Sequence, residues 1–331
     1  MTLDSDHSST FPSYLYAVLT CALVFLIWSL GRLQARILFD KVRSQTYSQT
    51  NSSKITTDVE FRRQEKVDVC TSISCIRCSK SVYSVEKLLT KWKEIEQAFE
   101  PDENTRNKVK NGILDTSKVS KKYRSSQQEP TLFYLEGLPS RSWYNKQDYS
   151  TEVSILEKKC TLGIFEEEFM KVYENLDKGW VSNKVPSGEW HLFYFINQGV
   201  KDYRNCLQCP KVVETIEGLE SAMLDCAFGN VMYSVLLPGT SIGRHCGPTN
   251  ARIRCHVPLI APKGYFISVA GEQRTWKKGD ILIFDDSFYH EVYCHAGLNE
   301  PRVVLMIDLW HPSLLLKERE MIRKLFSPQL T

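Results

Sequence analysis

Short apolar runs separated by turn residues make up most of the chain's second half, and this pattern limits the folds it can adopt. The turn signals are Pro238-Gly, Pro262-Lys-Gly and Lys278-Gly-Asp. We expect strands at residues 231–237, 251–259, 265–269, 280–284 and 302–309. Many short strands with turns between them are typical of a sandwich or a jelly roll.

Helical periodicity marks the segments that flank these strands. Residues 85–99 place five apolar side chains on one helical face: Leu88, Leu89, Trp92, Ile95 and Phe99. Residues 153–173 read as one further helix, and residues 314–326 as a closing amphipathic helix. The predicted fold class is therefore mainly β with flanking helices, and a double-stranded β-helix of the jelly-roll or cupin-like kind fits the pattern best.

Near the N-terminus, residues 14–30 form a run of seventeen residues without a charge. Such a length is at the short end of what spans a hydrocarbon core about 30 Å thick. Tyr14, Tyr16 and Trp28 lie at its two ends, as interfacial aromatic residues do. No basic residue precedes the run and no small-residue cleavage site follows it, so an uncleaved signal-anchor is predicted rather than a signal peptide.

The predicted organisation has four parts. A tail covers residues 1–13 and a transmembrane anchor residues 14–30; a stalk with a cysteine cluster and an amphipathic helix covers residues 31–129, and a globular domain residues 130–331. Within the stalk, residues 101–129 have the composition of a linker. The 42 basic and 39 acidic residues give a net charge of +3, which is too weak to predict a nucleic-acid partner.

Two histidines and an arginine carry the chemistry that the pattern predicts. His245 and His290 lie at the edges of strand-like runs, and Arg302 opens the last strand. This order is typical of double-stranded β-helix oxygenases that hold Fe(II) with imidazoles and bind 2-oxoglutarate through a cation. Gly247 stands two residues after His245, where the usual His-x-Asp/Glu triad has its carboxylate.

The segments at residues 239–256 and 284–293 resemble the aspartyl/asparaginyl β-hydroxylases, and among them the membrane-anchored aspartate β-hydroxylase domain-containing proteins. The resemblance covers roughly residues 130–315. It implies that His245 and His290 are the Fe(II) ligands, because the same glycine is present in that family and two histidines suffice there.

The resemblance also implies a cosubstrate site. By this resemblance, Ser234 and Arg302 are expected to contact the distal carboxylate of 2-oxoglutarate, and Arg254 and His256 to lie around the cosubstrate. Residues 252, 254 and 256 share one face of their strand. Arg252 is expected to face the acid group of the substrate, with a role as a rim cation as the alternative.

The function implied is that of a membrane-anchored Fe(II)- and 2-oxoglutarate-dependent dioxygenase that β-hydroxylates Asp or Asn in a polypeptide substrate. Two alternatives stand beside it: a catalytically silent jelly-roll protein that binds a metal or a partner at the membrane, and a cupin-like non-oxidative metalloenzyme. In a cupin-like non-oxidative metalloenzyme, Arg302 would have no assigned role.

The orientation of the anchor has two opposed indications. Four basic residues follow the span and none precedes it, which by the positive-inside rule leaves the C-terminal part in the cytosol: Arg32, Arg36, Lys41 and Arg43. The resemblance implies a type II protein with its catalytic domain in the lumen of the endoplasmic reticulum or secretory pathway. The sequon at Asn51 permits a glycan there.

Two C-x2-C pairs form a predicted structural set: Cys75 with Cys78, and Cys206 with Cys209. A structural zinc site and disulfide bonds are the two alternatives for this set.

Overall fold

The computed structural model describes residues 83–114, 125–173, 178–183, 185–295 and 297–328. All of them belong to one compact unit that spans residues 64–331. The predicted anchor at residues 14–30 and the pair Cys75 and Cys78 lie outside the described residues. Over the described ranges, no helix has both the length and the hydropathy to cross a membrane.

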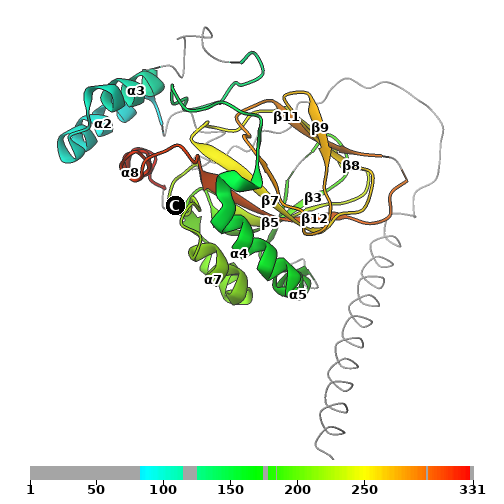
Figure 1. The fold of residues 1–331 in the computed structure, drawn as a ribbon. Coiled ribbons are helices and arrows are strands. Elements are labelled where there is room, and N and C mark those ends of the chain that lie inside the picture. Colours follow the sequence, from blue (N-terminus) through cyan, green and yellow to red (C-terminus); the bar gives the residue numbers. More distant parts are fainter. Residues whose placement is uncertain (1–82, 115–124, 174–177, 184, 296, 329–331) are drawn as a thin grey trace, which may run out of the picture. The chain divides into compact units, whose positions relative to one another are not determined.

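A large antiparallel sheet forms the centre of the unit (Figure 1). Its strand order is β1-β10-β7-β12-β5-β3-β2, and β4 pairs with β3. The strands are β1 (Trp143–Tyr144), β2 (Trp180–Asn183), β3 (Trp190–Asn197), β4 (Val200–Lys201), β5 (Val231–Leu236), β7 (Arg252–Ile260), β10 (Leu282–Phe284) and β12 (Arg302–Trp310).

A smaller antiparallel sheet faces it, with the order β6-β11-β8-β9. Its strands are β6 (Ile242–His245), β8 (Tyr265–Val269), β9 (Glu272–Thr275) and β11 (His290–Cys294). Between β5 and β12 the chain passes back and forth between the two sheets, so that the order β5-β12-β7-β10 in one faces β6-β11-β8-β9 in the other. This is the arrangement of a jelly roll, and it confirms the predicted mainly β fold class.

Helices cover the outer face of the large sheet, on the side away from the small sheet (Figure 1). They are α4 (Ser150–Thr161), α5 (Ile164–Tyr173), α6 (Tyr203–Gln208) and α7 (Pro210–Glu217), with the 3-10 helix η1 (Lys146–Tyr149) before them. Tyr233 Oη donates to the Phe165 carbonyl at 3.0 Å, which ties α5 to the middle of the sheet. The single helix predicted over residues 153–173 is wrong: Gly163 has a φ of +71°, which ends α4, and α5 begins at Ile164.

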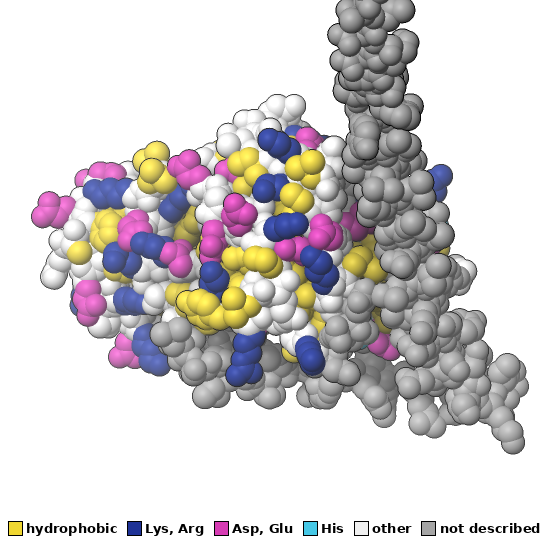
Figure 2. All heavy atoms as spheres, turned by 90° about the horizontal axis from the view of Figure 1, so that it is seen from below, with side chains coloured by type: hydrophobic (Ala, Val, Ile, Leu, Met, Phe, Trp, Pro, Cys, Tyr) yellow, Lys and Arg dark blue, Asp and Glu magenta, His cyan; other side chains and the backbone are white. Residues whose placement is uncertain are grey.

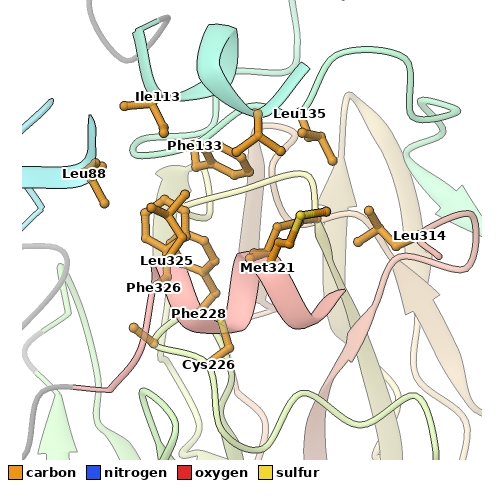
Figure 3. Close-up of a cluster of buried hydrophobic side chains, with 14 of the residues drawn as sticks. Leu88, Ile113, Phe133, Leu135, Cys226, Phe228, Leu314, Met321, Leu325 and Phe326 are labelled. Carbon is orange, nitrogen blue, oxygen red and sulfur yellow. The ribbon is translucent and has the colours of Figure 1, made fainter. Parts of the chain in front are cut away.

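A hydrophobic cluster joins the N-terminal helices to the jelly roll. Helices α2 (Val85–Phe99), α3 (Glu103–Leu114) and α8 (Leu316–Leu325) surround it. Figure 3 shows side chains from all of these segments pointing toward one another, with Phe133, Phe228 and Phe326 at the centre. The helix predicted at residues 85–99 is confirmed as α2. The linker predicted over residues 101–129 contains α3, whose Val109 and Ile113 are buried in this cluster.

The surface of the unit mixes charges of both signs. On the face drawn in Figure 2, basic and acidic side chains are interspersed with apolar ones. Several surface ion pairs join such neighbours, among them Lys278 with Glu166 at 2.6 Å and Lys171 with Glu167 at 2.9 Å.

Candidate active site

The two histidines meet at one end of the small sheet. β6 ends at His245 and β11 begins at His290, and the two residues are direct partners in the antiparallel ladder. Their ring centroids are 4.1 Å apart. Nδ1 of each ring lies close to the backbone oxygen two residues earlier, Gly243 O at 2.8 Å and Phe288 O at 2.9 Å. Because a carbonyl only accepts, each Nδ1 carries the proton, and the lone pair is at Nε2, as in a metal-binding imidazole.

Burial keeps the inner histidine neutral. Removal from water, with the neighbouring His245 as the next cause, lowers the pKa of His290 to about 3. An imidazole binds a metal only in its neutral form, so this environment favours the ligating state at neutral pH.

Position 247, where a third ligand would stand in the usual triad, is filled from another segment. A Cβ at Gly247 would lie 2.6 Å from Cγ and both carboxylate oxygens of Asp286. The Gly247 amide also donates to the Asp286 carbonyl at 2.6 Å. Only a glycine leaves room for the Asp286 side chain here.

Asp286 belongs to a buried group of two arginines and two aspartates: Arg252, Arg254, Asp286 and Asp308. Arg254 Nε donates to Asp308 Oδ1 at 2.9 Å, and its Nη1 lies 3.2 Å from Asp286 Oδ2. Arg252 pairs with Asp286 and, at 3.3 Å, with Asp308. Burial alone would raise the pKa of Asp286, but the two arginines hold it well below its usual range. The group has no net charge, so each cation in it is compensated.

Arg302 differs from these arginines because its charge is not compensated in the described part of the chain. It is 2% exposed. Its Nε and Nη1 have no hydrogen-bond partner among the described residues, and Nη2 reaches Ser234 Oγ only at 3.5 Å. Burial lowers its pKa to about 9, which still leaves it charged at neutral pH. A buried guanidinium with spare donors calls for an anionic ligand.

Trp276 and His256 stand beside Arg302. The Arg302 guanidinium carbon lies 4.9 Å from the centre of the Trp276 ring. The Trp276 indole N–H donates to His256 Nδ1 at 3.2 Å, and His256 Nε2 is buried without a partner among the described residues. Burial, followed by the charge of Arg302, lowers the pKa of His256 well below its usual value.

Apolar side chains enclose these groups between the two sheets. They include Met232, Leu236, Ile267, Val269, Phe284, Val292, Val304 and Met306. The ring of Phe284 packs edge-on against His256, with centroids 5.0 Å apart, and its centroid lies 5.9 Å from that of His290. The interior between the sheets is therefore mostly apolar and holds a small number of polar groups.

A separate cavity of about 150 Å³ opens beside His290 at the rim of the small sheet. Gln127, Arg244, Tyr289 and Glu291 line it. Arg244 lies over the Tyr289 ring at 4.3 Å and donates to Gln127 Oε1 at 2.9 Å. This cavity offers space next to the histidine pair on the solvent side.

The structure thus places most of the predicted site residues in or beside the interior between the two sheets. His245 and His290 pair, Arg302 meets Ser234, and His256 joins them through Trp276. Arg254 and Arg252 lie on the same face of β7 but point into the neutral ion group. Cys206 and Cys209 lie apart from this interior, at α6 and its junction with α7, as buried free thiols. With Cys75 and Cys78 outside the described residues, their structural set stays a prediction.

Two functional neighbours were not identified from the sequence: Trp276 and Asp308. Neither has a motif of its own, because each acts through a cross-strand or through-space contact. In the ranges that the structure describes, no group of three or more His, Cys, Asp or Glu side chains could hold a metal ion.

Comparisons with known proteins find similar sequences over most of this chain. A family model described as aspartyl/asparaginyl β-hydroxylase matches residues 161–312. The chain is 35% identical to aspartate β-hydroxylase domain-containing protein 2 of Homo sapiens over 322 residues, which cover 94% of this chain and 84% of that relative. It is 36% identical to domain-containing protein 1 of Mus musculus over 61% of this chain and 57% of that relative.

The aspartyl/asparaginyl β-hydroxylase of Mus musculus is 34% identical over 195 residues, and the match spans only 26% of that longer protein. A solved prolyl-4-hydroxylase from Pseudomonas putida is similar over 49% of this chain at 11% identity, with a TM-score of 0.31, which is too low to support an argument.

Proposed function

Because the chain belongs to the aspartyl/asparaginyl β-hydroxylase family, we propose that it is an Fe(II)- and 2-oxoglutarate-dependent dioxygenase. Its reaction would be β-hydroxylation of an Asp or Asn residue in a polypeptide, with the enzyme held at a membrane by residues 14–30. The single observation that supports this best is the pair of histidines whose Nδ1 atoms are both engaged by backbone carbonyls.

The donor set fits the proposed metal. Imidazole nitrogens suit iron, and both rings present Nε2 as the ligating atom. Bound Fe(II) would supply the activation of O₂ that couples oxidative decarboxylation of 2-oxoglutarate, to succinate and CO₂, with insertion of one oxygen atom into a C–H bond. His245 and His290 are the residues that would hold it.

Arg302 supports 2-oxoglutarate as the cosubstrate. The distal carboxylate of 2-oxoglutarate would accept from the two donors of Arg302 that have no partner among the described residues, with the Ser234 hydroxyl beside them. Such a charge-assisted contact in a buried site both neutralises the guanidinium and fixes the register of the ligand. His256 Nε2 adds a neutral donor in the same interior between the sheets.

The other residues of the interior exclude water and hold these groups in place. The apolar lining of the two sheets surrounds these groups. Asp286 and Asp308 compensate Arg252 and Arg254, so an anionic ligand meets one uncompensated cation rather than three. The cavity beside His290 is the proposed position for the polypeptide substrate, whose residue to be hydroxylated must come close to the metal ligands.

Succinate formation by the purified full chain tests the proposal. The full chain is used because α2 and α3 pack into the hydrophobic core of the domain. We expect Fe(II)-dependent release of succinate from 2-oxoglutarate, stimulated by Asp- or Asn-containing peptides, and its loss in His245→Ala. Arg323→Met, which changes a surface arginine 39% exposed, serves as the control.

The result also separates the alternative function. A wild-type chain that retains Fe(II) but releases no succinate with any peptide would support the catalytically silent metal-binding protein. Retention of full activity in His245→Ala would contradict the proposed metal site.

A further inference from the structure

Trp276 makes two contacts that no sequence motif predicted. It lies just after β9 and is 4% exposed. Its indole N–H donates to Nδ1 of His256 at 3.2 Å, and the planes of the two rings are inclined by 22°. Its ring face carries the Arg302 guanidinium at 4.9 Å.

The hydrogen bond decides where the proton of His256 sits. An indole nitrogen is a donor only, so Nδ1 of His256 must accept, and the ring proton must be on Nε2. In the other tautomer two N–H groups would face each other inside the protein, which loses the bond and leaves a buried donor unmatched. His256 is 6% exposed, so water offers little relief.

The second contact of Trp276 is with the charged side chain of Arg302. A guanidinium over an indole face is attracted by the ring quadrupole, more strongly where both are out of water. Arg302 Nε and Nη1 remain without a partner in the described residues, as does His256 Nε2. Trp276 therefore contacts both His256 and Arg302, each of which has at least one side-chain nitrogen without a partner among the described residues.

We propose that Trp276 is a positioning residue for the cosubstrate: it fixes His256 in the Nε2–H tautomer and holds Arg302 in place, so that a neutral donor and a cation meet one dicarboxylate. This inference rests on the proposed function for its ligand, 2-oxoglutarate, but the tautomer can be tested without any ligand. Trp276 itself is not assigned a contact with the cosubstrate.

Nitrogen-15 NMR of histidine-labelled full chain tests the tautomer. Long-range proton–nitrogen correlations distinguish a protonated ring nitrogen from an unprotonated one, and His256→Gln identifies the signal. In the wild type we expect a single Nε2–H form. In Trp276→Phe, which keeps an aromatic face but removes the N–H, we expect an Nδ1–H population to appear.

Trp143→Phe is the matched control. Trp143 is another buried tryptophan of the same interior, and its N–H has no partner among the described residues. Its replacement should leave the His256 tautomer unchanged. Isothermal titration with 2-oxoglutarate should show affinity about fivefold to tenfold weaker in Trp276→Phe, as expected for one lost hydrogen bond and a looser arginine, with unchanged retention of Fe(II).

Each outcome is informative. An Nδ1–H form in the wild type, or a pure Nε2–H form in Trp276→Phe, overturns the inference, and the wild-type spectrum decides even if the variant does not fold. A tautomer change without a change in affinity overturns the role in cosubstrate binding. Failure of the wild type to bind 2-oxoglutarate contradicts the proposed function and the choice of ligand, and leaves the tautomer result standing.

Discussion

Buried arginines in this protein fall into two kinds, and the difference is visible atom by atom. Arg254 is paired with two carboxylates, and burial is outweighed by these charges so that its pKa is raised. Arg302 is as deeply buried, yet its pKa is lowered to about 9. A charge held in a low-dielectric interior without a partner costs stability, and proteins keep such a group where a ligand supplies the partner.

The same substitution should therefore have opposite effects on stability at the two positions. Arg302→Met removes an uncompensated charge, so the free energy of unfolding should stay constant or rise. Its affinity for 2-oxoglutarate should fall about tenfold to hundredfold, since a charge-assisted hydrogen bond contributes about 1.5–3 kcal/mol. Arg254→Met leaves buried carboxylates undercompensated and should cost about 3–5 kcal/mol of stability.

Denaturant unfolding and titration calorimetry measure both quantities. Equal destabilisation by the two substitutions would show that Arg302 is compensated in the same way as Arg254. Wild-type affinity for 2-oxoglutarate in Arg302→Met would remove Arg302 from the cosubstrate site.

A third buried histidine, His311, gives the protein a pH dependence of stability away from the interior between the two sheets. The Ser313 amide donates to its Nδ1 at 3.1 Å, and its Nε2 lies 2.7 Å from Tyr144 Oη and 3.1 Å from the Pro139 carbonyl. The neutral ring satisfies these contacts, whereas a proton on Nδ1 would face the Ser313 donor. Burial lowers the pKa of His311 to about 4.

The sign of the effect follows from the unfolded state, where a histidine has a pKa of about 6.5. Between these two values the unfolded chain binds a proton that the folded chain does not, so stability is lost as the pH falls. Between pH 7 and pH 5 the loss from this residue should be about 2 kcal/mol. His311→Gln should reduce the pH dependence by that amount in urea unfolding at the two pH values. An identical loss in both proteins would contradict the assignment.

At the scale of elements, the register of β7 against β12 assembles the ion group. Asp308 stands directly opposite Arg254, and the same face of β7 carries Arg252 and His256. Alternation along a strand places every second residue inside, so one register fixes three polar side chains in the interior at once. A shift by one residue would put Ile253 and Cys255 there and the arginines under the helices.

Gly247 gives a test of how tightly the loop after β6 fits this ion group. A methyl group at position 247 would overlap the Asp286 carboxylate, which lies 2.6 Å from the position of its Cβ. Overpacking of a buried site costs about 1–3 kcal/mol, so Gly247→Ala should lower the free energy of unfolding by that amount. Gly243→Ala in the same strand region is the control, since its nearest neighbour is Pro186 Cγ at 3.9 Å.

Thermal unfolding of the two variants measures the difference. Equal stability of Gly247→Ala and Gly243→Ala would show that Asp286 moves away at little cost, and the explanation for the glycine at this position would then fail.

The sequence predicted the large sheet better than the small one, for a physical reason. The predicted runs at residues 231–237 and 302–309 correspond to β5 and β12, whose residues are all buried and mostly apolar. β9 (Glu272–Thr275) has an exposed or partly exposed polar sequence, and nothing in its periodicity distinguishes it from a loop. Within the small sheet, the predicted run at residues 265–269 corresponds to β8, whereas β9 was not predicted.

The residues of the candidate site also divide into those that the sequence could predict and those that it could not. His245, His290 and Arg302 could be selected because their order and surrounding residues resemble a family motif. The role of Trp276 could not, because a contact between the end of β9 and the middle of β7 depends on tertiary structure. The pairing of Arg254 with Asp308 was likewise hidden, since the two residues are 54 positions apart.

At the scale of the whole molecule, the N-terminal helices belong to the domain rather than to a linker. Leu88 and Trp92 of α2 and Ile113 of α3 share a core with Phe326, which follows α8. The segment that leads from the predicted anchor therefore ends on a packed element.

The orientation of the predicted anchor is the remaining question at this scale. The proposed type II arrangement places the catalytic domain in the lumen, although four basic residues follow the span and favour the cytosol. A folded domain of the size seen here can be translocated largely regardless of nearby charge, so the charge rule is not decisive. We expect a C-terminal tag to be protected from protease in sealed microsomes and digested after detergent is added.

Two variants sharpen this last prediction. Asn51→Gln should remove a glycan, seen as a loss of the mass shift on glycosidase treatment, only if the residues after the span are lumenal. The double change of Arg32 and Arg36 to Gln should increase the protected fraction if the basic flank opposes translocation. Digestion of the tag without detergent, together with an unglycosylated Asn51, would show that the basic residues set the orientation and that the hydroxylase domain faces the cytosol.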